Sequence, residues 1–168
     1  MQDLVETLKK VESSSIFKEQ KEKHKEIYLA SFFKMADDEK EEIQLHYYNP
    51  ETDKMILFII ADEITSQESE VFKQSDAIIK ELKLDEVKIN FEEASKIISK
   101  LLSEKYNHES PNKRIFILQN LEKPIWNITY LTTSINLLNV KINAITGEII
   151  SENITPALQL GKVNPESQ

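Results

Sequence analysis

The stretch that decides the fold is Ile125–Ser151, IWNITYLTTSINLLNVKINAITGEIIS. Two runs within it alternate apolar and polar residues, and their apolar members are Trp126, Ile128, Tyr130, Leu138, Val140 and Ile142. Successive side chains of an extended chain point to opposite sides, so this alternation indicates strands that each bury one face. Thr146-Gly147 then allows the chain to reverse, because glycine readily adopts positive φ. The stretch therefore predicts antiparallel strands that end in a hairpin through Glu148-Ile149-Ile150.

Upstream of this stretch, the apolar residues follow a helical period. Asn90 is a favourable N-cap, and the acidic pair Glu92 and Glu93 suits the positive end of a helix. The apolar stripe that follows consists of Phe91, Ala94, Ile97, Ile98, Leu101 and Leu102. We expect this helix to reach about Tyr106 and a further strand to occupy residues 113–119.

The first half of the chain shows a similar order of patterns. Residues 3–12 have the apolar spacing of an amphipathic helix, and Ser14 or Ser15 can cap a second short helix that ends near Lys23. The three strands predicted after these helices are residues 27–35, 43–48 and 55–61. Helix followed by antiparallel strands in both halves predicts an α+β fold with two architecturally related halves.

The third of these strands is apolar on both faces. Met55, Leu57 and Ile59 would point to one side, while the residues between them, Ile56, Phe58 and Ile60, would point to the other. Strands of this kind are usually covered on both sides. We therefore expect a helix on one face of this sheet and, on the other face, either the second half of the chain or another subunit.

Composition and spacing divide the chain into four parts. A first half of helices and three strands covers residues 1–64, and a second half of one helix and antiparallel strands covers residues 89–152. The connection at residues 65–88 is polar and contains neither glycine nor proline, so we expect a short helix or two there rather than a flexible linker. Residues 153–168 form a C-terminal tail whose end is predicted to be disordered.

The residues from about Ile89 to Ser151 resemble the PepSY domain. The resemblance rests on a helix that contains Glu93-Ala94, on Trp126 in a strand, and on the ending Asn143-Ala144-Ile145-Thr146-Gly147-Glu148-Ile149. The family usually has Asp where this chain has Asn143. The first half looks like a degenerate second copy, which makes the chain similar to tandem PepSY-like proteins with cystatin-like folds, including uncharacterised archaeal ones. The resemblance implies a peptidase-inhibitory or regulatory module.

Charge and composition exclude several classes of function. The 168 residues carry 29 acidic and 21 basic side chains, a net charge of −8, which argues against binding to nucleic acids or to anionic membranes. No run of residues is long and apolar enough for a membrane span or a signal peptide, so we expect a cytoplasmic protein. The preference for lysine over arginine, with Arg114 the only arginine, indicates an AT-rich genome, and the charged fraction of 30% is compatible with a thermophile.

Residues that could carry catalysis are sparse or badly spaced. There is no cysteine, and two glycines cannot form a phosphate-binding loop. The histidines His24, His46 and His108 lie in different predicted elements and lack metal-ligand spacing. The acidic runs, such as Asp37-Asp38-Glu39, lie in a predicted turn and are best explained as a solvated surface. We therefore expect a protein that is not an enzyme and that has no metal site and no cofactor.

Four aromatic residues are the candidates for binding a partner. Trp126, Tyr130, Tyr47 and Tyr48 could line a protein-binding or peptide-binding face, because tryptophan and tyrosine are favoured as interface anchors. The alternative, which the alternating pattern favours, is that Trp126 and Tyr130 pack beneath the helix of residues 91–106. The expected function is non-enzymatic binding or regulation, with a protein or peptide, such as a peptidase, as partner. The runner-up is a structural component that forms a homodimer through the first-half sheet.

Overall fold

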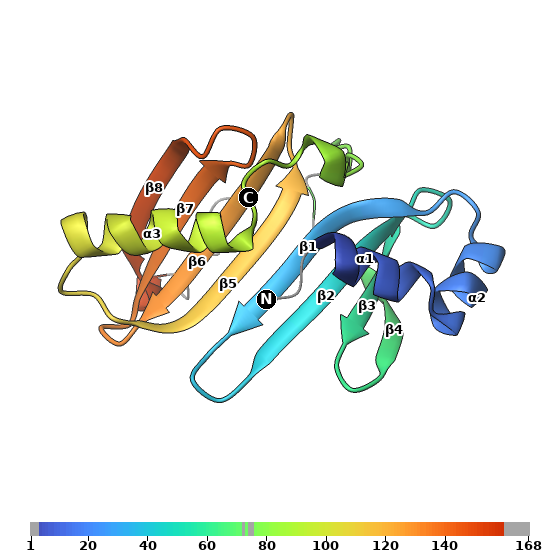
Figure 1. Ribbon diagram of the computed structural model, residues 1–168, viewed down its shortest axis with the longest axis horizontal. Coiled ribbons are helices and arrows are strands. Elements are labelled where there is room, and N and C mark those ends of the chain that lie inside the picture. The colour runs from blue at the N-terminus through green and yellow to red at the C-terminus, as the bar shows by residue number, and fades with distance from the viewer. Residues whose placement is uncertain (1–3, 72, 74–75, 160–168) are drawn as a thin grey trace, which may run out of the picture.

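The computed structural model describes residues 4–71, 73 and 76–159, and these residues form one antiparallel sheet with helices on it (Figure 1). The helices are α1 (Leu4–Glu12), α2 (Ser15–Lys23) and α3 (Phe91–Lys105), with 3-10 turns η1 (Leu84–Glu86) and η2 (Ala157–Gln159). The strands are β1 (Tyr28–Ala36), β2 (Glu41–Asn49), β3 (Lys54–Ile60), β4 (Ile64–Glu70), β5 (Pro111–Asn120), β6 (Pro124–Thr132), β7 (Asn136–Asn143) and β8 (Ile149–Pro156).

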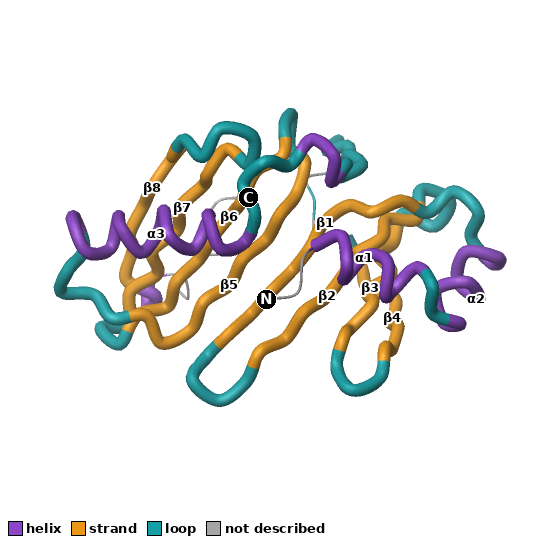
Figure 2. The backbone as a smooth tube through the Cα atoms, viewed as in Figure 1, coloured by secondary structure: helices purple, strands orange, loops and turns teal. Residues whose placement is uncertain are grey.

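The eight strands lie in the order β4-β3-β2-β1-β5-β6-β7-β8, and every neighbouring pair is antiparallel. The two central strands, β1 and β5, are distant in sequence and pair over Ser31–Ala36 and Arg114–Gln119. Figure 2 shows how the strands on either side of this pair twist away from it. The α+β fold class predicted from the sequence is confirmed.

Local signals in the sequence produce the expected helix starts and the expected hairpin. Ser14 caps α2 by accepting a hydrogen bond from the amide of Phe17, and Asn90 and Glu93 form a reciprocal capping box at the start of α3. Gly147 adopts a φ of 78° in the turn before β8, and its amide donates to the carbonyl of Asn143. The caps and the turn give hydrogen-bond partners to backbone groups that would otherwise be unpaired.

Two predictions about secondary structure were wrong. The connection at residues 65–88 forms no α-helix among its described residues, and most of β4 lies in its first part. β4 is an edge strand that is held to β3 by backbone pairing, so it forms without a buried apolar face. Its sequence, ITSQESE, therefore has almost none of the apolar alternation by which strands were predicted. Likewise β8 continues to Pro156, inside the predicted tail, for the same reason at the opposite edge. The predicted disorder at the end of the chain concerns residues outside the described ones.

All three helices lie on one face of the sheet, which we call the helix face (Figure 1). One row of register partners crosses four strands on this face, from Leu45 through Phe32 and Leu118 to Trp126. The core lies between these residues and the apolar sides of the helices. The second half of the chain therefore extends the first-half sheet sideways. It does not cover the other face of that sheet, contrary to one of the two alternatives that the sequence left open.

Candidate functional site

Three of the four aromatic candidates lie in the core of the helix face. Trp126 is 0% exposed, and its indole N–H donates to the carbonyl oxygen of Ile89 at 2.8 Å. Its ring contacts that of Phe91 in α3, and Tyr130 contacts Phe116 edge to face. Packing under α3, the alternative that the sequence favoured, is therefore what the structure has. Trp126 offers no surface to a partner.

Tyr47 is also a core residue, and it joins α1 to β2. Its hydroxyl donates to the carboxylate of Glu12 at 2.9 Å, and its ring contacts those of Phe17 and Phe58. Burial and the neighbouring carboxylate raise the pKa of Tyr47 far above its ordinary value, so the hydroxyl stays protonated and donates. The arrangement fixes α1 and α2 on the sheet.

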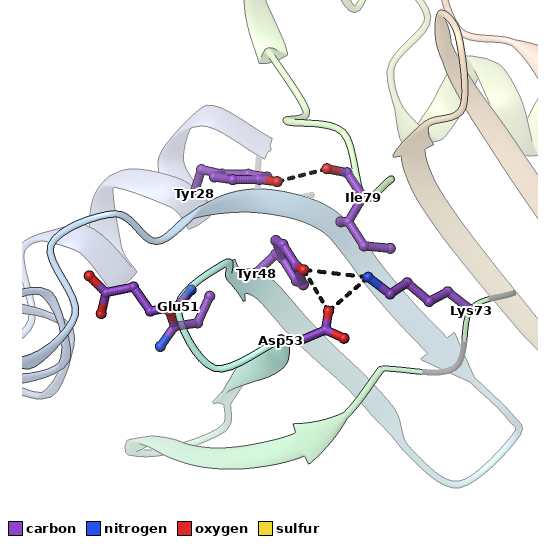
Figure 3. Close-up of polar contacts among 7 residues, drawn as sticks. Tyr28, Tyr48, Glu51, Asp53, Lys73 and Ile79 are labelled. Atoms are coloured by element: carbon purple, nitrogen blue, oxygen red, sulfur yellow. Dashed lines mark hydrogen bonds and ion pairs between the residues drawn. The ribbon is translucent and has the colours of Figure 1, made fainter. Parts of the chain in front are cut away.

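Tyr48 points to the opposite face, where it belongs to a small polar cluster (Figure 3). Its hydroxyl donates to Asp53 at 2.6 Å, and the ammonium group of Lys73 reaches the same carboxylate oxygen at 2.7 Å. Next to it, Tyr28 donates to the carbonyl oxygen of Ile79 at 2.7 Å. The hydrogen bonds from Lys73 and Tyr48 lower the pKa of Asp53. These contacts tie the chain after β4 to the β2–β3 turn, which is a structural role.

The face without helices, which we call the open face, carries a block of apolar side chains at its centre. Phe33 and Met35 of β1 are register partners of Ile117 and Ile115 of β5, and all four are half-buried. They point away from the helix face because their strand neighbours, such as Phe32 and Phe116, point into the core. Further apolar members of the same face on β3 are Met55, Leu57 and Ile59. A contiguous group of half-buried apolar side chains on a sheet face without helices is a candidate contact surface.

His46 lies within the open face, between the apolar members of β1 and β3. Its ring stacks on Phe33, with ring centroids 5.8 Å apart, and its two nitrogens contact Ser31 and Gln44 at 3.1 and 2.8 Å. Burial lowers the pKa of His46 to about 4, so the ring is neutral near pH 7. Leu57 is its register partner on β3. The open face is therefore uncharged at this point.

The helix face contains a cleft of about 730 Å³, between α3 and the strands β1, β5 and β6. This volume lies within the range of small-molecule sites, roughly 300–1,000 Å³. The floor of the cleft carries Lys34, Arg114 and Tyr130, and the wall on α3 carries three serines, Ser95, Ser99 and Ser103. Sequence reasoning identified only Tyr130 among these residues. A signal was present, because the three serines recur at intervals of four residues, beside the apolar stripe of α3.

Glu109 closes one end of this cleft and is 7% exposed. One carboxylate oxygen accepts a hydrogen bond from the side-chain amide of Asn136 at 2.7 Å. The hydroxyl of Thr132, and after it the amide of Asn136, lower the pKa of Glu109, so the carboxylate stays charged near pH 7. Glu109 thereby joins the α3–β5 loop to the β6–β7 turn.

Residues suited to metal binding do not come together within the described part of the chain. Among the described residues, no three His, Asp or Glu side chains converge in the manner of a metal site. His24 follows α2, His46 lies in β2 and His108 lies in the α3–β5 loop. Asp37 accepts hydrogen bonds from the amides of Glu39 and Lys40, which lower its pKa and stabilise the β1–β2 turn.

Comparison with solved structures gives a likeness of fold, and the other comparisons with known proteins give no match. No family model and no curated protein matches the chain. The chain is similar to the crystal structure of a protein from Clostridium difficile 630 described as a putative lipoprotein, with a TM-score of 0.59 and 11% sequence identity over 91% of this chain and 93% of that one. At this identity the likeness concerns the fold alone. No helix of the described chain has the length and apolar content needed to cross a membrane.

Proposed function

We propose that this protein is a non-enzymatic binding or regulatory protein, built from two PepSY-like, cystatin-like halves, that binds a protein partner through the open face of its sheet. The single observation that carries the proposal is the central apolar block of Phe33, Met35, Ile115 and Ile117. A peptidase is the class of partner that the PepSY resemblance implies. The cytoplasmic location expected from the sequence belongs to the same proposal.

The order of elements supports two equivalent halves. Each half consists of helix and then four strands, and the strands of each half run outward from the central pair β1 and β5. The second strands also correspond in detail, since Tyr47 of β2 and Tyr130 of β6 both point into the core beneath their own helices. Two halves arranged in this way produce one continuous sheet with a wide open face.

The chemistry of the open face supports a protein partner. Interfaces are apolar and poor in charge at their centre, with a polar rim. Here the central block is flanked by uncharged polar residues, Gln44 and Asn127, which are the register neighbours of Phe33 and Ile117 on either side. Glu42, the register partner of Met35, places one acidic group at the edge of the block, where an interface has its polar rim. In the proposed mechanism the partner buries its own apolar surface against the block. If the partner is a peptidase, the rigid sheet blocks its cleft without being cleaved.

The test is a pull-down with the tagged full chain from a lysate of the source organism, with partners identified by mass spectrometry. We compare the wild type with Ile117→Lys, which places a charge in the block, and with Asn153→Lys, which places the same charge on exposed β8 of the same face. The proposal expects a specific partner, retained by Asn153→Lys and lost with Ile117→Lys. If that partner is a peptidase, an inhibition assay follows. Retention of the partner by both variants would refute the role of the open face.

A second candidate function is self-assembly through the open face of the first half. The observation in its favour is that Leu57 and Ile59 extend the apolar surface onto β3, where no described helix covers them, whereas Met55 lies beside Ile78 and Ile79 of the chain after β4. Light scattering at micromolar concentration distinguishes the two candidates. A dimer that dissociates on Leu57→Lys would support self-assembly, and a monomer would exclude it at that concentration.

A further inference from the structure

The cleft beside α3 lies on the helix face, opposite the surface proposed for partner binding. Its wall is made by Ser95, Ser99 and Ser103, one turn apart on α3, and Ala36 lies on its floor as the register partner of Arg114. Larger apolar side chains at these positions would fill the space between α3 and β1, as the buried Ile98 of α3 does elsewhere on the sheet. Small side chains therefore keep the cleft open.

Two donors in this cleft have no partner. The guanidinium group of Arg114 makes no ion pair or hydrogen bond with any described residue, although this is the only arginine of the chain. Tyr130 is 3% exposed, and its hydroxyl likewise has no hydrogen bond within the described part of the chain. The two residues are direct register partners on β5 and β6, so they act side by side. Although the residue as a whole is nearly buried, its hydroxyl opens onto the cleft, where a ligand can reach it.

The other charged groups of the cleft are already engaged. Lys34 forms an ion pair with Glu41 at 2.9 Å and lies 4.1 Å from the ring centroid of Phe91. One carboxylate oxygen of Glu109 accepts from the amide of Asn136, whereas the other is buried and has no hydrogen bond within the described part of the chain. The lining carries two positive and two negative groups, so its net charge is zero. Arg114 can balance one negative charge of a ligand, but the additional charges of a multiply charged anion would be repelled by the carboxylates of Glu41 and Glu109.

We propose that the cleft binds a ligand with a single carboxylate next to an apolar group. Arg114 forms a bidentate ion pair with this carboxylate, and the hydroxyl of Tyr130 donates a hydrogen bond to it. A planar guanidinium group matches a carboxylate in this way. The rings of Phe91 and Phe116, whose centroids lie 4.6 Å apart, provide the apolar contact. Either a free small acid or the C-terminus of a peptide has this chemistry. The inference is independent of the partner proposed for the open face.

The test is a titration of the full chain with small probes, in which binding is monitored by the amide chemical shifts in NMR spectra. The probes are N-acetyl-leucine, its uncharged amide, a pentapeptide with a free C-terminus ending in leucine, and inorganic phosphate. The expected result is saturable shifts at Ser95, Ser99 and Arg114 with the carboxylate probes and none with the amide or phosphate. Tighter binding of the pentapeptide than of N-acetyl-leucine would identify a chain end as the ligand, and the reverse would identify a free acid.

Variants identify the groups responsible. Arg114→Met is expected to weaken binding of N-acetyl-leucine by about tenfold to a hundredfold, and Tyr130→Phe by several-fold, because each removes a hydrogen bond to a charged group. The matched control is Lys113→Met, which removes the same charge from the adjacent position of β5, on the opposite face. Tyr106→Phe is the control for the hydroxyl, since Tyr106 contacts Glu152 outside the cleft. Absence of shifts at millimolar probe, or equal binding by Arg114→Met and Lys113→Met, would overturn the proposal.

Discussion

Lowering the pH from 7 to 5 is expected to destabilise this protein through His46. The ring is half-buried in the open face, where Nε2 donates to Gln44 and Nδ1 accepts from Ser31 in the neutral form. Burial lowers the pKa of His46 from an ordinary 6.5 to about 4. The unfolded chain therefore binds a proton below about pH 6.5 that the folded chain does not bind until about pH 4. Stability contributed by neutral His46 is present at pH 7 and is lost as the pH falls through this window.

The size of the effect follows from the two pKa values. A difference between 6.5 and about 4 corresponds to a loss of about 2 kcal/mol between pH 7 and pH 5. Because the ring is only half-buried, surrounding water reduces this loss, and we expect about 1–2 kcal/mol in the free energy of unfolding. The carboxylates with lowered pKa, Asp37, Asp53 and Glu109, lose their contribution at lower pH, so they do not obscure the window.

The assay is urea denaturation followed by the fluorescence of Trp126, the single tryptophan, which is buried in the core. We compare the wild type at pH 7 and pH 5 with His46→Gln, and with His24→Gln and His108→Gln as controls on the other two histidines. The pH dependence should be absent only in His46→Gln. If His46→Gln shows the same loss as the wild type, or if NMR titration gives His46 a pKa near 6.5, the reasoning from burial is wrong.

Three further perturbations test the fold. Gly147→Ala places a side chain at a φ of 78° and near Ile89, and should lower the free energy of unfolding by about 1–2 kcal/mol in urea denaturation. Asn90→Ala removes the cap of α3 and should cost about 1 kcal/mol in the same assay, whereas Asn90→Asp, which retains a cap, should cost less. Trp126→Phe leaves the carbonyl oxygen of Ile89 without its donor and should cost about 1–3 kcal/mol, measured by circular dichroism; a loss under half that size would show that another donor replaces the indole.

The candidate site could be predicted only in part. The alternation of apolar and polar residues placed Trp126 and Tyr130 on one face of a strand, and it favoured their packing beneath α3 over a surface role. The sequence indicated a second apolar face on β3, but the continuation of this face over β1 and β5 was not predicted, and neither was the cleft. The open face depends on which side of a doubly apolar strand the helices cover. The cleft depends on how far α3 lies from β1. Both are relations between elements that are far apart in the sequence.

The sequence by itself determined the elements that short-range physics controls. Helix caps act within a few residues, as do the reversal at Gly147 and the period of the apolar residues, so they can be read along the chain. The sequence placed one cap at Asn90 and the other at Ser14 or Ser15, of which the structure has Ser14. Only the tertiary structure decided that Ser31–Ala36 pairs with Arg114–Gln119, because strand pairing joins residues far apart in sequence and many registers have similar local patterns. That one pairing makes a single eight-stranded sheet, leaves its open face apolar at the centre, and places Arg114 beside a cleft.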